Sequence, residues 1–443
     1  MQETAHTQWW SCFQGRAGWW IFFVALALRV GWVLTLDNAL TWADERDFVG
    51  IGMGMTEGKG YVSDSFRAAP GMPVYLSLVF RVFGESYLAA RLGQCVLGAL
   101  TCVLLWRLGV MLAGELAGVL AGVVLALYPP FVYLAGVFYV ECLLTFLLTL
   151  SVYLVVRTAR PGEKWWMGLL AGVALGMTTL TRSTFVLFVP CVMLAWLCGM
   201  QAGGRRRVLA CVVFCVGMAA VVAPWAWRNQ RVFGRFVLVN TGFYSALWRG
   251  NSELTTGAAT ERDLFWRTPL WSERANQLPV EQREALNEKY ARIDREYRVK
   301  EAELGDAIMA YDAVVKPVAM ELVRTNPGRT ARLFVRKVGV LYSAFSPTTS
   351  SNAYTTGKVK QIAVLTFYPI LLLGLAGIWL CRARWREWLP VGLLIGVVTG
   401  AHGLLIAATR YRLPIDVCWV LLAAAAVGCL TRRWTHGISE GAE

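Results

Sequence analysis

The sequence predicts an all-α polytopic membrane protein with about ten transmembrane helices and two long exterior loops that carry amphipathic interfacial helices. Charged residues make up only 16% of its 443 residues, whereas they make up about 25% of an average soluble domain. Apolar residues account for 56% of the chain and arrive in blocks of about 20, the length that crosses the hydrocarbon core of a bilayer. Basic residues gather at alternate ends of these blocks, as in other polytopic membrane proteins. These observations exclude a soluble multidomain enzyme and a disordered or fibrous chain.

Short polar turns separate most of the apolar blocks, and each block is interpreted as one transmembrane helix. The predicted spans are residues 18–36, 87–108, 113–130, 134–157, 164–181, 183–201, 207–225, 361–380, 388–408 and 412–431. Glycine recurs at every fourth position at Gly114, Gly118 and Gly122, which predicts that one face of the third span packs closely against another helix.

Two polar stretches interrupt this pattern, and because they are too long to be turns they divide the chain into parts. Residues 1–225 form an N-terminal membrane module of about seven spans, which includes the first exterior loop at 37–86. Residues 226–360 form the second exterior loop region, and residues 361–443 form a C-terminal membrane module of about three spans.

The net charge of +14 is distributed unevenly between the two ends of the spans. One side receives Arg16, Arg107, Arg157, Arg160, Lys164, Arg205, Arg206, Arg207, Arg382, Arg384, Arg386, Arg432 and Arg433. The short turns on the other side contain only Arg182, Arg410 and Arg412. By the positive-inside rule the basic side is cytoplasmic, both termini are inside and both long loops are outside. The first span then acts as an uncleaved signal anchor, and the charge does not indicate a nucleic acid partner.

Histidine is scarce, and this limits the chemistry that the chain can perform. It occurs only as His6, His402 and His436, which nearly excludes a histidine-based metal site or a Ser-His-Asp triad. The glycine-rich run VGIGMGMTEGKG lacks the spacing of a nucleotide-binding loop. Catalysis must therefore depend on carboxylates, arginines and polar groups of the exterior loops.

The first exterior loop opens with an acidic run, DNALTWADERDF, directly after the first span. Carboxylates at the edge of an apolar span are partly desolvated, which raises their pKa and makes them better bases near neutral pH. Asp44 could equally belong to a solvated loop and cap the next helix. Pro70 and Pro73 then begin a short amphipathic helix, 73–83, which we expect to lie in the exterior interface.

The second exterior loop is predicted to be largely helical. It begins with aromatic residues within 225–251, which suit sugar stacking and interfacial anchoring equally. Residues 280–304 predict a highly charged helix with a solvated face, and the next stretch, 306–325, is more amphipathic. The triplet NPG ends that stretch, and RTARLFVRKVGVLYSAF then predicts a basic amphipathic helix at the membrane surface.

A series of segments, taken in chain order, resembles one family of membrane enzymes. The segments are ADERDF, GKGY, RAAPGMPVYLSLVFRVFG, AARLGQCVLGAL, YPPFVYLAGVFYVECLL, GVALGMTTLTRST, APWAWRNQRVFGRFVLVNTGFYSALWRGN and ATRYRLPID. Together they resemble the integral-membrane glycosyltransferases with the GT-C fold, in the branch of the protein O-mannosyltransferases and aminoarabinose transferases, glycosyltransferase family 39. The resemblance covers most of the chain except about 255–320, and it depends on the ordered set because no single segment is specific.

The resemblance implies an inverting glycosyltransferase that moves a sugar from a polyprenyl-phosphate-linked donor to an acceptor at the outer face of the cytoplasmic membrane. The general base of the family is the acidic residue of the first exterior loop, which maps onto Asp44, with Glu45 beside it. The reaction needs a base for the acceptor proton and electrostatic stabilisation of the leaving lipid phosphate. Because that phosphate is already anionic, no general acid is required.

Arginines at the outer ends of the spans are the candidates for binding the donor phosphate, because guanidinium groups match phosphate oxygens. The favoured pair is Arg67 and Arg410, and the others are Arg182 and Arg228. Contact with lipid headgroups, or snorkelling, would explain each of them without a substrate. Arg412 is expected to pair with Asp416, one helical turn further on.

Charges inside the predicted spans are expected to support the site from below. Glu141 and Arg29 each lie about seven residues from the outer end of a span, roughly 10 Å below the surface. Intramembrane charges usually pair, so we expect Glu141 to pair with Arg29 or Arg91 and to position the first loop. Contact with a substrate or a metal is the alternative role for Glu141. Tyr411 and Asn251 complete the predicted supporting residues.

The expected partners are a polyprenyl-phosphate hexose or pentose donor, membrane lipids, and a protein, lipid or glycan acceptor that the sequence does not identify. No cofactor is required, and although carboxylates could hold a divalent metal, no motif supports one. A non-enzymatic transporter or flippase for lipid-linked glycans is an alternative, but no inverted repeat is visible and the polar groups gather at the outer face. A ligase or polymerase that uses a diphosphate-lipid glycan is the other alternative.

Overall fold

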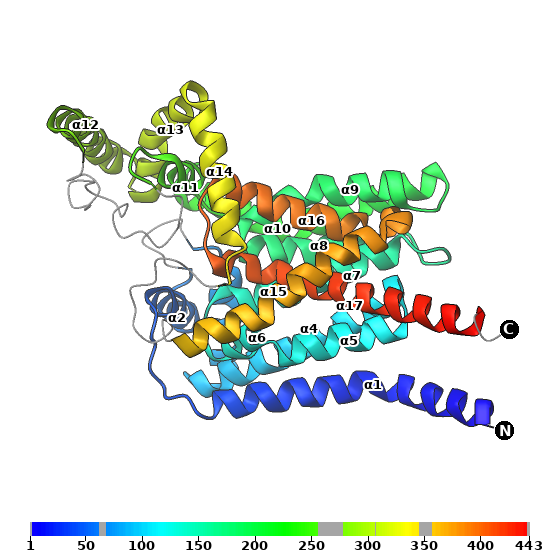
Figure 1. Ribbon diagram of the computed structural model, residues 1–443. Helices are drawn as coiled ribbons and strands as arrows, with labels where there is room; N and C mark the ends of the chain where they lie inside the picture. Colours follow the sequence, from blue (N-terminus) through cyan, green and yellow to red (C-terminus); the bar gives the residue numbers. More distant parts are fainter. Residues whose placement is uncertain (1, 62–67, 256–277, 306, 345–356, 441–443) are drawn as a thin grey trace.

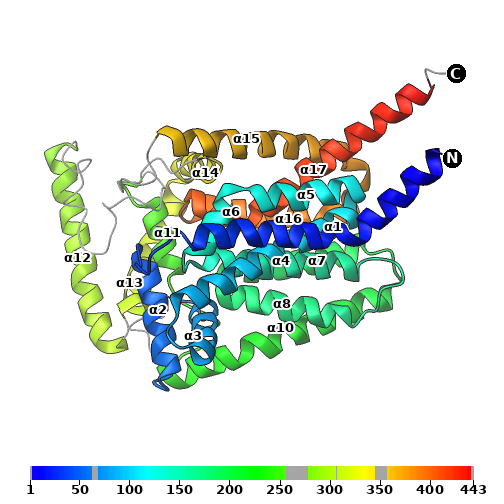
Figure 2. The same cartoon turned by 90° about the horizontal axis from the view of Figure 1, so that it is seen from below.

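The computed structural model describes residues 2–61, 68–255, 278–305, 307–344 and 357–440. Its secondary-structure elements are helices, and the long ones lie side by side in one bundle (Figures 1 and 2). Both chain ends lie at one end of the bundle, and the helices of the two long loops lie at the opposite end. This arrangement agrees with the predicted topology, in which both loops emerge on the side away from the termini.

Each predicted span coincides with a helix or with a helical segment. These elements are α1 (Gln2–Val33), α4 (Tyr87–Ala113), α5 (Glu115–Leu127), α7 (Val140–Thr158), α8 (Met167–Thr181), η2 (Ser183–Leu187) with α9 (Phe188–Gly199), α10 (Gly204–Phe233), α15 (Gly357–Leu380), α16 (Trp385–Leu404) and α17 (Thr409–Glu440). Within the described ranges, seven helices are long and apolar enough to cross a membrane, or eight if a bent pair counts as one span. α8 and the η2–α9 segment are apolar but shorter. An all-α polytopic membrane protein is confirmed, and the number of crossings stays a prediction.

The bent pair is formed by α5 and the short helices α6 (Pro129–Tyr133) and η1 (Leu134–Gly136), which meet at 57°. Two consecutive prolines follow Tyr128, and proline cannot donate the backbone hydrogen bond that would continue the helix. α7 therefore begins at Val140 and not at residue 134. The segment between the bend and α7 lies at the end of the bundle next to α2. Residues such as Tyr139 and Glu141 therefore lie at this end and not in the middle of a continuous span.

Small residues let neighbouring helices approach closely, as the glycine spacing predicts. A methyl group at Gly118 would lie 2.7 Å from the Trp106 carbonyl oxygen of α4, and one at Gly122 would lie 3.2 Å from the Cys102 carbonyl oxygen. Gly114 begins α5 with φ of 90°, which favours glycine. The glycine face of α5 is thus packed directly on the backbone of α4.

α17 is the most buried of the candidate spans and packs against α15 on one side and α4, α5 and α7 on another. Near its start Arg412 and Asp416 form the predicted ion pair, with 2.8 Å between Nε and Oδ1 and both residues buried. Tyr128 donates to the other oxygen of Asp416 at 3.1 Å. The C-terminal helices therefore share one core with the N-terminal helices.

The loop helices cover the end of the bundle that is remote from the termini (Figure 1). The first loop forms α2 (Ala43–Thr56) and α3 (Gly71–Phe83), and the second forms α11 (Phe243–Asn251), α12 (Val280–Leu304), α13 (Ala307–Thr325) and α14 (Pro327–Leu341). The interfacial, charged and basic helices predicted from the sequence correspond to α3, α12 and α14. Proline begins α14, where its missing N–H costs no helical hydrogen bond.

Candidate active site

Asp44 and Arg410 form an ion pair at the end of the bundle opposite to the chain termini. Asp44 lies in the first turn of α2, and Arg410 lies in the first turn of α17. Arg410 Nη1 lies 3.2 Å from Asp44 Oδ2, and the two side chains are 39% and 31% exposed. The structure thus brings together the predicted base and one of the two favoured phosphate-binding arginines, and it leaves both accessible.

Glu45 holds the first turn of α2 in place. Its Oε2 accepts a hydrogen bond from the backbone N–H of Trp42 at 3.0 Å, and its Oε1 accepts one from the backbone N–H of Phe138 at 2.9 Å. The residue is 1% exposed. Because both oxygens are used by backbone donors, Glu45 joins α2 to the segment before α7 and orients the neighbouring Asp44.

Arg91 fixes the stretch of chain that leads into α2. Its two terminal nitrogens donate to the carbonyl oxygens of Asp37 and Ala39. Its guanidinium carbon lies 5.5 Å from the centre of the Phe138 ring. The side chain is buried and belongs to α4, so the start of the first loop is attached to a transmembrane helix.

Glu141 pairs with Arg182, with 3.0 Å between Oε1 and Nη2. The prediction that it pairs with Arg29 or Arg91 is therefore wrong. Because α7 begins at Val140, Glu141 lies in the first turn of the helix at its outer end and not deep in a span. A carboxylate in the first turn also interacts favourably with the helix dipole.

Aromatic rings connect the two ion pairs. The guanidinium carbon of Arg410 lies 5.0 Å from the ring centre of Tyr139 and 5.4 Å from that of Tyr411. Arg182 lies 5.0 Å from the same Tyr411 ring, and the His402 ring stacks on Tyr411 at 4.8 Å. Two cations are thus held on one aromatic surface, which orders their planar groups.

Arg182 retains a hydrogen-bonding group that the described part of the chain does not satisfy. Its Nη1 is buried and donates to no atom in the described ranges. Leaving a buried donor unsatisfied costs free energy, about 1–3 kcal/mol in typical proteins. A phosphate oxygen placed between Arg182 and Arg410 would accept this hydrogen bond, because guanidinium groups bind phosphate through paired N–H donors. This arrangement suits the binding of an anion by Arg182 and Arg410, next to the Asp44 carboxylate.

Comparison with known proteins shows what part of the chain is similar to. Residues 67–227 match the sequence family described as dolichyl-phosphate-mannose-protein mannosyltransferase. The match includes α3 to α9 and most of α10. No curated protein sequence matches the chain.

The fold of the chain resembles solved structures at low sequence identity. The archaeal oligosaccharyltransferase AglB from Archaeoglobus fulgidus, in complex with an inhibitory peptide and a dolichol-phosphate, is 14% identical with a TM-score of 0.56; the match covers 97% of this chain and 52% of that one. The apo form of the Archaeoglobus fulgidus enzyme is 15% identical with a TM-score of 0.56, covering 96% and 52%. ArnT from Cupriavidus metallidurans bound to undecaprenyl phosphate is 16% identical with a TM-score of 0.44, covering 95% and 78%. The chain spans about half the length of the oligosaccharyltransferase chains.

Arg29 stabilises the bent pair of α5 with α6 and η1. It is fully buried, and it donates to the carbonyl oxygens of Leu125 and Ala126 at 3.5 and 3.4 Å. These carbonyls lie in the last turn of α5, where the residues four positions on, Pro129 and Pro130, have no N–H to donate to them. The Leu125 carbonyl also accepts a hydrogen bond from the Tyr128 N–H at 3.4 Å. By binding the end of α5, Arg29 holds the bend in place. The bend leads through α6 and η1 to Phe138, whose backbone N–H donates to Glu45.

Arg228, another predicted phosphate ligand, binds elsewhere in the described structure. Arg228 donates to the Tyr61 carbonyl oxygen at 2.7 Å and stacks 4.9 Å from the Trp225 ring, so it joins the stretch of the first loop after α2 to α10. Arg67 lies outside the described residues. Of the predicted arginines, the structure brings Arg410 and Arg182 together around Tyr411.

Asn251 joins the second loop to the end of α16. It is buried and donates to the Leu404 carbonyl oxygen at 2.9 Å, at the end of α16. Its own side-chain oxygen accepts a hydrogen bond from Lys337 at 3.2 Å. Lys337 also donates to the carbonyls of Leu404 and Leu405 at 2.8 and 2.9 Å. These contacts dock α11 and α14 on the turn that leads into α17 and Arg410.

The acidic residues around the site do not form a set of metal ligands. Asp44 and Glu141 are each paired with an arginine, and Glu45 binds two backbone N–H groups. Across the described ranges, no group of three or more His, Cys, Asp or Glu residues is placed to hold a metal ion. Divalent cations such as Mg²⁺ need several oxygen ligands, and Asp44, Glu45 and Glu141 already have these other partners.

Two residues of the cluster, Tyr139 and His402, are absent from the sequence-based prediction. Tyr139 appears from sequence to lie inside a continuous span, and only the break at the two prolines places it beside Arg410. His402 appears to be the isolated histidine of a span. The two consecutive prolines, which end the helix before Tyr139, were the feature of the sequence that could have predicted its position. No feature of the sequence predicts that His402 stacks on Tyr411.

Proposed function

We propose that this protein is an inverting glycosyltransferase that moves a sugar from a polyprenyl-phosphate-linked donor to an acceptor at the outer face of the cytoplasmic membrane. The observation that carries the proposal is the accessible Asp44–Arg410 pair, with Arg182 and its unsatisfied buried Nη1 on the same aromatic surface. It combines a proton acceptor with two phosphate-binding groups. The protein is an integral membrane protein, and in this proposal its termini are cytoplasmic and its active site faces the exterior or periplasm.

Arg410 and Arg182 would bind the phosphate of the donor. In the described structure each guanidinium is balanced by one carboxylate. A donor phosphate that draws Arg410 toward itself weakens the contact with Asp44. Because a neighbouring cation favours the charged form of a carboxylate, this weakening makes Asp44 a stronger base when the donor is bound.

Asp44 would then accept the proton of the acceptor group. The acceptor heteroatom forms a bond with the anomeric carbon as the bond from that carbon to the phosphate oxygen breaks. Attack from the face opposite to the phosphate inverts the anomeric configuration. The lipid phosphate leaves with its negative charge stabilised by the arginines, and the proton remains on Asp44 until it is released to solvent.

Glu45 is assigned a positioning role in this mechanism. The sequence-based hypothesis gives it a catalytic role beside Asp44, but its two oxygens accept hydrogen bonds from Trp42 and Phe138. A carboxylate whose two oxygens are engaged in this way, and which is 1% exposed, has no free oxygen to present to an acceptor group. Its loss would displace α2 rather than remove the base.

Substitution of Asp44 tests the proposal. We expect Asp44→Asn to lower kcat by about 10²–10⁴-fold, because the amide cannot accept the acceptor proton. The measurement is sugar transfer by the purified full-length protein from a labelled polyprenyl-phosphate sugar, with product configuration determined by NMR. Asp47→Asn is the matched control, because Asp47 is an exposed carboxylate on the same helix. If Asp44→Asn remained folded and turned over at nearly the wild-type rate, Asp44 would not be the base.

The class of donor requires a separate measurement. AglB, which shares the fold, is an oligosaccharyltransferase that has been solved with a dolichol-phosphate, so a lipid-linked oligosaccharide is the competing donor. Mass spectrometry of lipids that co-purify with the protein distinguishes a monophosphate carrier from a diphosphate carrier. A diphosphate-linked glycan would reassign the protein as a ligase, and binding without any transfer would favour a lipid-glycan transporter.

A further inference from the structure

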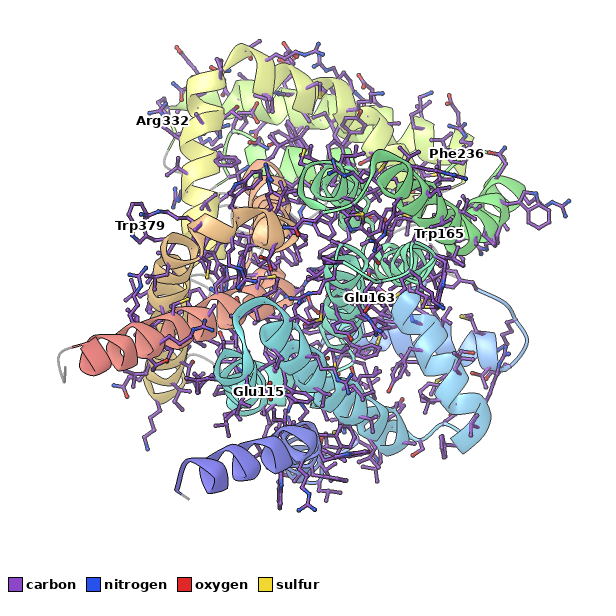
Figure 3. The ribbon with its side chains drawn as sticks, turned by 90° about the vertical axis from the view of Figure 1, so that its right-hand side faces the viewer. Glu115, Glu163, Trp165, Phe236, Arg332 and Trp379 are labelled. Carbon is purple, nitrogen blue, oxygen red and sulfur yellow. The ribbon has the colours of Figure 1, made fainter. Side chains whose placement is uncertain are left out.

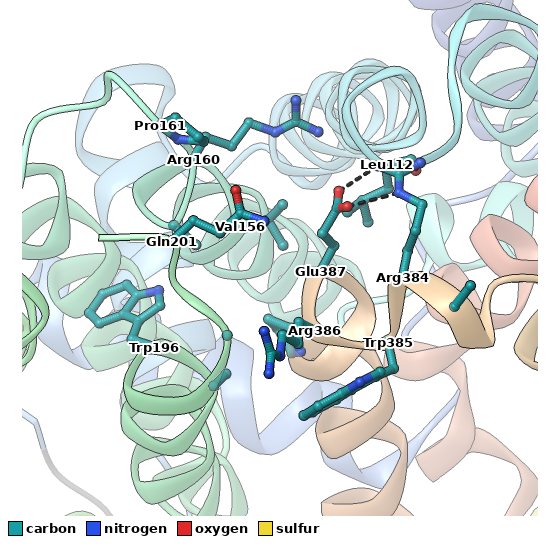
Figure 4. Close-up of a pocket in the computed structure, with 15 residues that line it drawn as sticks. Leu112, Val156, Arg160, Pro161, Trp196, Gln201, Arg384, Trp385, Arg386 and Glu387 are labelled. Atoms are coloured by element: carbon teal, nitrogen blue, oxygen red, sulfur yellow. Dashed lines mark hydrogen bonds and ion pairs between the residues drawn. The ribbon is translucent and has the colours of Figure 1, made fainter. Parts of the chain in front are cut away.

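α16 connects the two ends of the bundle and brings a histidine to the candidate active site. It begins at the end that carries the chain termini, which faces the viewer in Figure 3. Its first residues, Trp385, Arg386 and Glu387, help to line a cavity at that end (Figure 4). It ends at Leu404, and His402 lies buried in its last turn. The proposed glycosyl transfer gives this buried side chain no role, although it lies beside the arginines that would bind the donor.

The imidazole of His402 makes two contacts that fix its orientation. Its ring stacks on the ring of Tyr411, with 4.8 Å between the ring centres and 22° between the planes. Its Nδ1 lies 3.0 Å from the carbonyl oxygen of Ile406. Because a carbonyl oxygen only accepts hydrogen bonds, Nδ1 carries a hydrogen and donates it. A rotation of the side chain would break the stacking contact or the hydrogen bond.

Tyr411 is the ring on which the two proposed phosphate-binding arginines meet. The guanidinium carbon of Arg182 lies 5.0 Å from the ring centre, and that of Arg410 lies 5.4 Å from it. Arg182 follows the last residue of α8, whereas Arg410 lies in the first turn of α17 beside the tyrosine. Because a cation–π contact depends on where the cation lies over the ring, the orientation of Tyr411 affects how the two guanidinium groups are placed relative to each other.

The turn between α16 and α17 is held by more than His402. The carbonyl oxygens of Leu404 and Leu405 accept hydrogen bonds from Lys337 at 2.8 and 2.9 Å, and the next carbonyl, that of Ile406, accepts the one from His402. Three successive carbonyl groups are thus satisfied by side chains of α14 and α16. Loss of the histidine hydrogen bond alone would leave the turn held by Lys337.

We propose that His402 is a positioning residue for the donor phosphate and that it acts through its stacking contact with Tyr411. This inference rests on the proposed function, in which Arg182 and Arg410 bind that phosphate. The stacked imidazole restricts the Tyr411 ring, and the ring in turn restricts the two guanidinium groups. Groups that are already held in their binding orientation lose less conformational freedom when the ligand binds, so the stacking contact increases the affinity for the lipid phosphate.

Two substitutions separate the ring of His402 from its hydrogen bond. His402→Phe keeps a ring that can stack on Tyr411 but cannot donate to Ile406, whereas His402→Asn keeps an N–H donor and has no ring. We expect His402→Asn to raise the Kd for polyprenyl phosphate about three- to tenfold, and His402→Phe to stay within about twofold of the wild type. The measurement is a titration of the purified full-length protein with polyprenyl phosphate that carries no sugar, followed by native mass spectrometry.

Thr399→Ala is the matched control. Thr399 lies on the same helix, one turn before His402, and its hydroxyl forms a hydrogen bond of 2.8 Å with the hydroxyl of Tyr342. Its loss removes a polar contact of α16 and leaves the stacking on Tyr411 intact, so the Kd for polyprenyl phosphate should equal that of the wild type. The Tm of each variant without ligand reports its stability separately from the affinity of the folded protein.

The comparison of the variants decides the assignment. A folded His402→Asn protein that bound polyprenyl phosphate as tightly as the wild type would overturn it, and so would a His402→Phe protein that bound as weakly as His402→Asn. A wild type that bound no polyprenyl phosphate would contradict the proposed function as well. The expected order of affinities in a protein that transferred no sugar would support the role of His402 and contradict only the glycosyl transfer.

Discussion

Lys337 is a buried lysine whose chemistry differs from that of an exposed one. It is fully buried on α14, and burial lowers its pKa from 10.5 to about 7, with a smaller contribution from Arg329. Its ammonium group donates to three oxygens of α11 and of the α16–α17 turn. The protonation state of this lysine is therefore coupled to the docking of the second loop on the site.

This coupling predicts a pH dependence of stability. Between about pH 7 and 10.5 the unfolded chain holds a proton that the folded chain has lost, so the free energy of unfolding rises with pH across this window and does not change below it through this group. We expect Lys337→Met to remove this rise. The measurement is Tm in one detergent from about pH 6.5 to about 9.5.

The control for this prediction is Lys300→Met, since Lys300 lies on α12 and is half exposed. It should retain the wild-type slope of Tm against pH. A Lys337→Met protein with the same slope as the wild type would show that another group is responsible.

At the scale of single elements, close helix contacts hold the N-terminal spans together. Gly118→Ala would place a methyl group 2.7 Å from the Trp106 carbonyl oxygen and 2.8 Å from the Val110 nitrogen, both of which are backbone atoms. Because backbone cannot move aside cheaply, we expect a destabilisation of about 1–3 kcal/mol and a lower Tm.

Gly392→Ala is the matched control, because Gly392 is also inside a helix but has no atom within 4 Å of the added methyl group. Its Tm should stay unchanged or rise slightly, since alanine favours the helix by about 1 kcal/mol. Equal effects of the two substitutions would contradict the packing assigned to α4 and α5.

The same scale shows where sequence reasoning about helices succeeds and fails. Hydropathy predicts a helix or helical segment at each span, and the amphipathic patterns predict α3, α12 and α14, because these properties depend on neighbours in the chain. The boundaries are less accurate, since α1 begins at Gln2 and not at residue 18, and α10 continues to Phe233 and does not end at residue 225. The start of α7 is the main error. A continuous apolar run conceals the break after Tyr128, and the depth assigned to Glu141, and with it the choice of its partner, was wrong for that reason.

At the scale of the whole molecule, both termini lie at one end and both long loops lie at the other (Figure 2). The distribution of arginines predicts that the end with the termini is cytoplasmic. In a variant without native cysteines, we expect an impermeant maleimide to label Glu288→Cys in intact cells and Arg205→Cys only after permeabilisation. Both positions are exposed, one on α12 and one at the start of α10. The reverse pattern of labelling would invert the topology and place the Asp44 site inside the cell.

The sequence by itself determined the class of protein, the order of its spans, the predicted sidedness and the residue types available for catalysis. These follow from apolar length, charge asymmetry and local motifs, which are read over a few tens of residues. Only the tertiary structure decided which charges meet. Arg410 and Asp44 are separated by 366 positions, and their contact, like that of Glu141 with Arg182, depends on how α2, α7, α8 and α17 pack. A bend at two prolines and a docked loop helix set that packing, and no local pattern specifies the resulting distances.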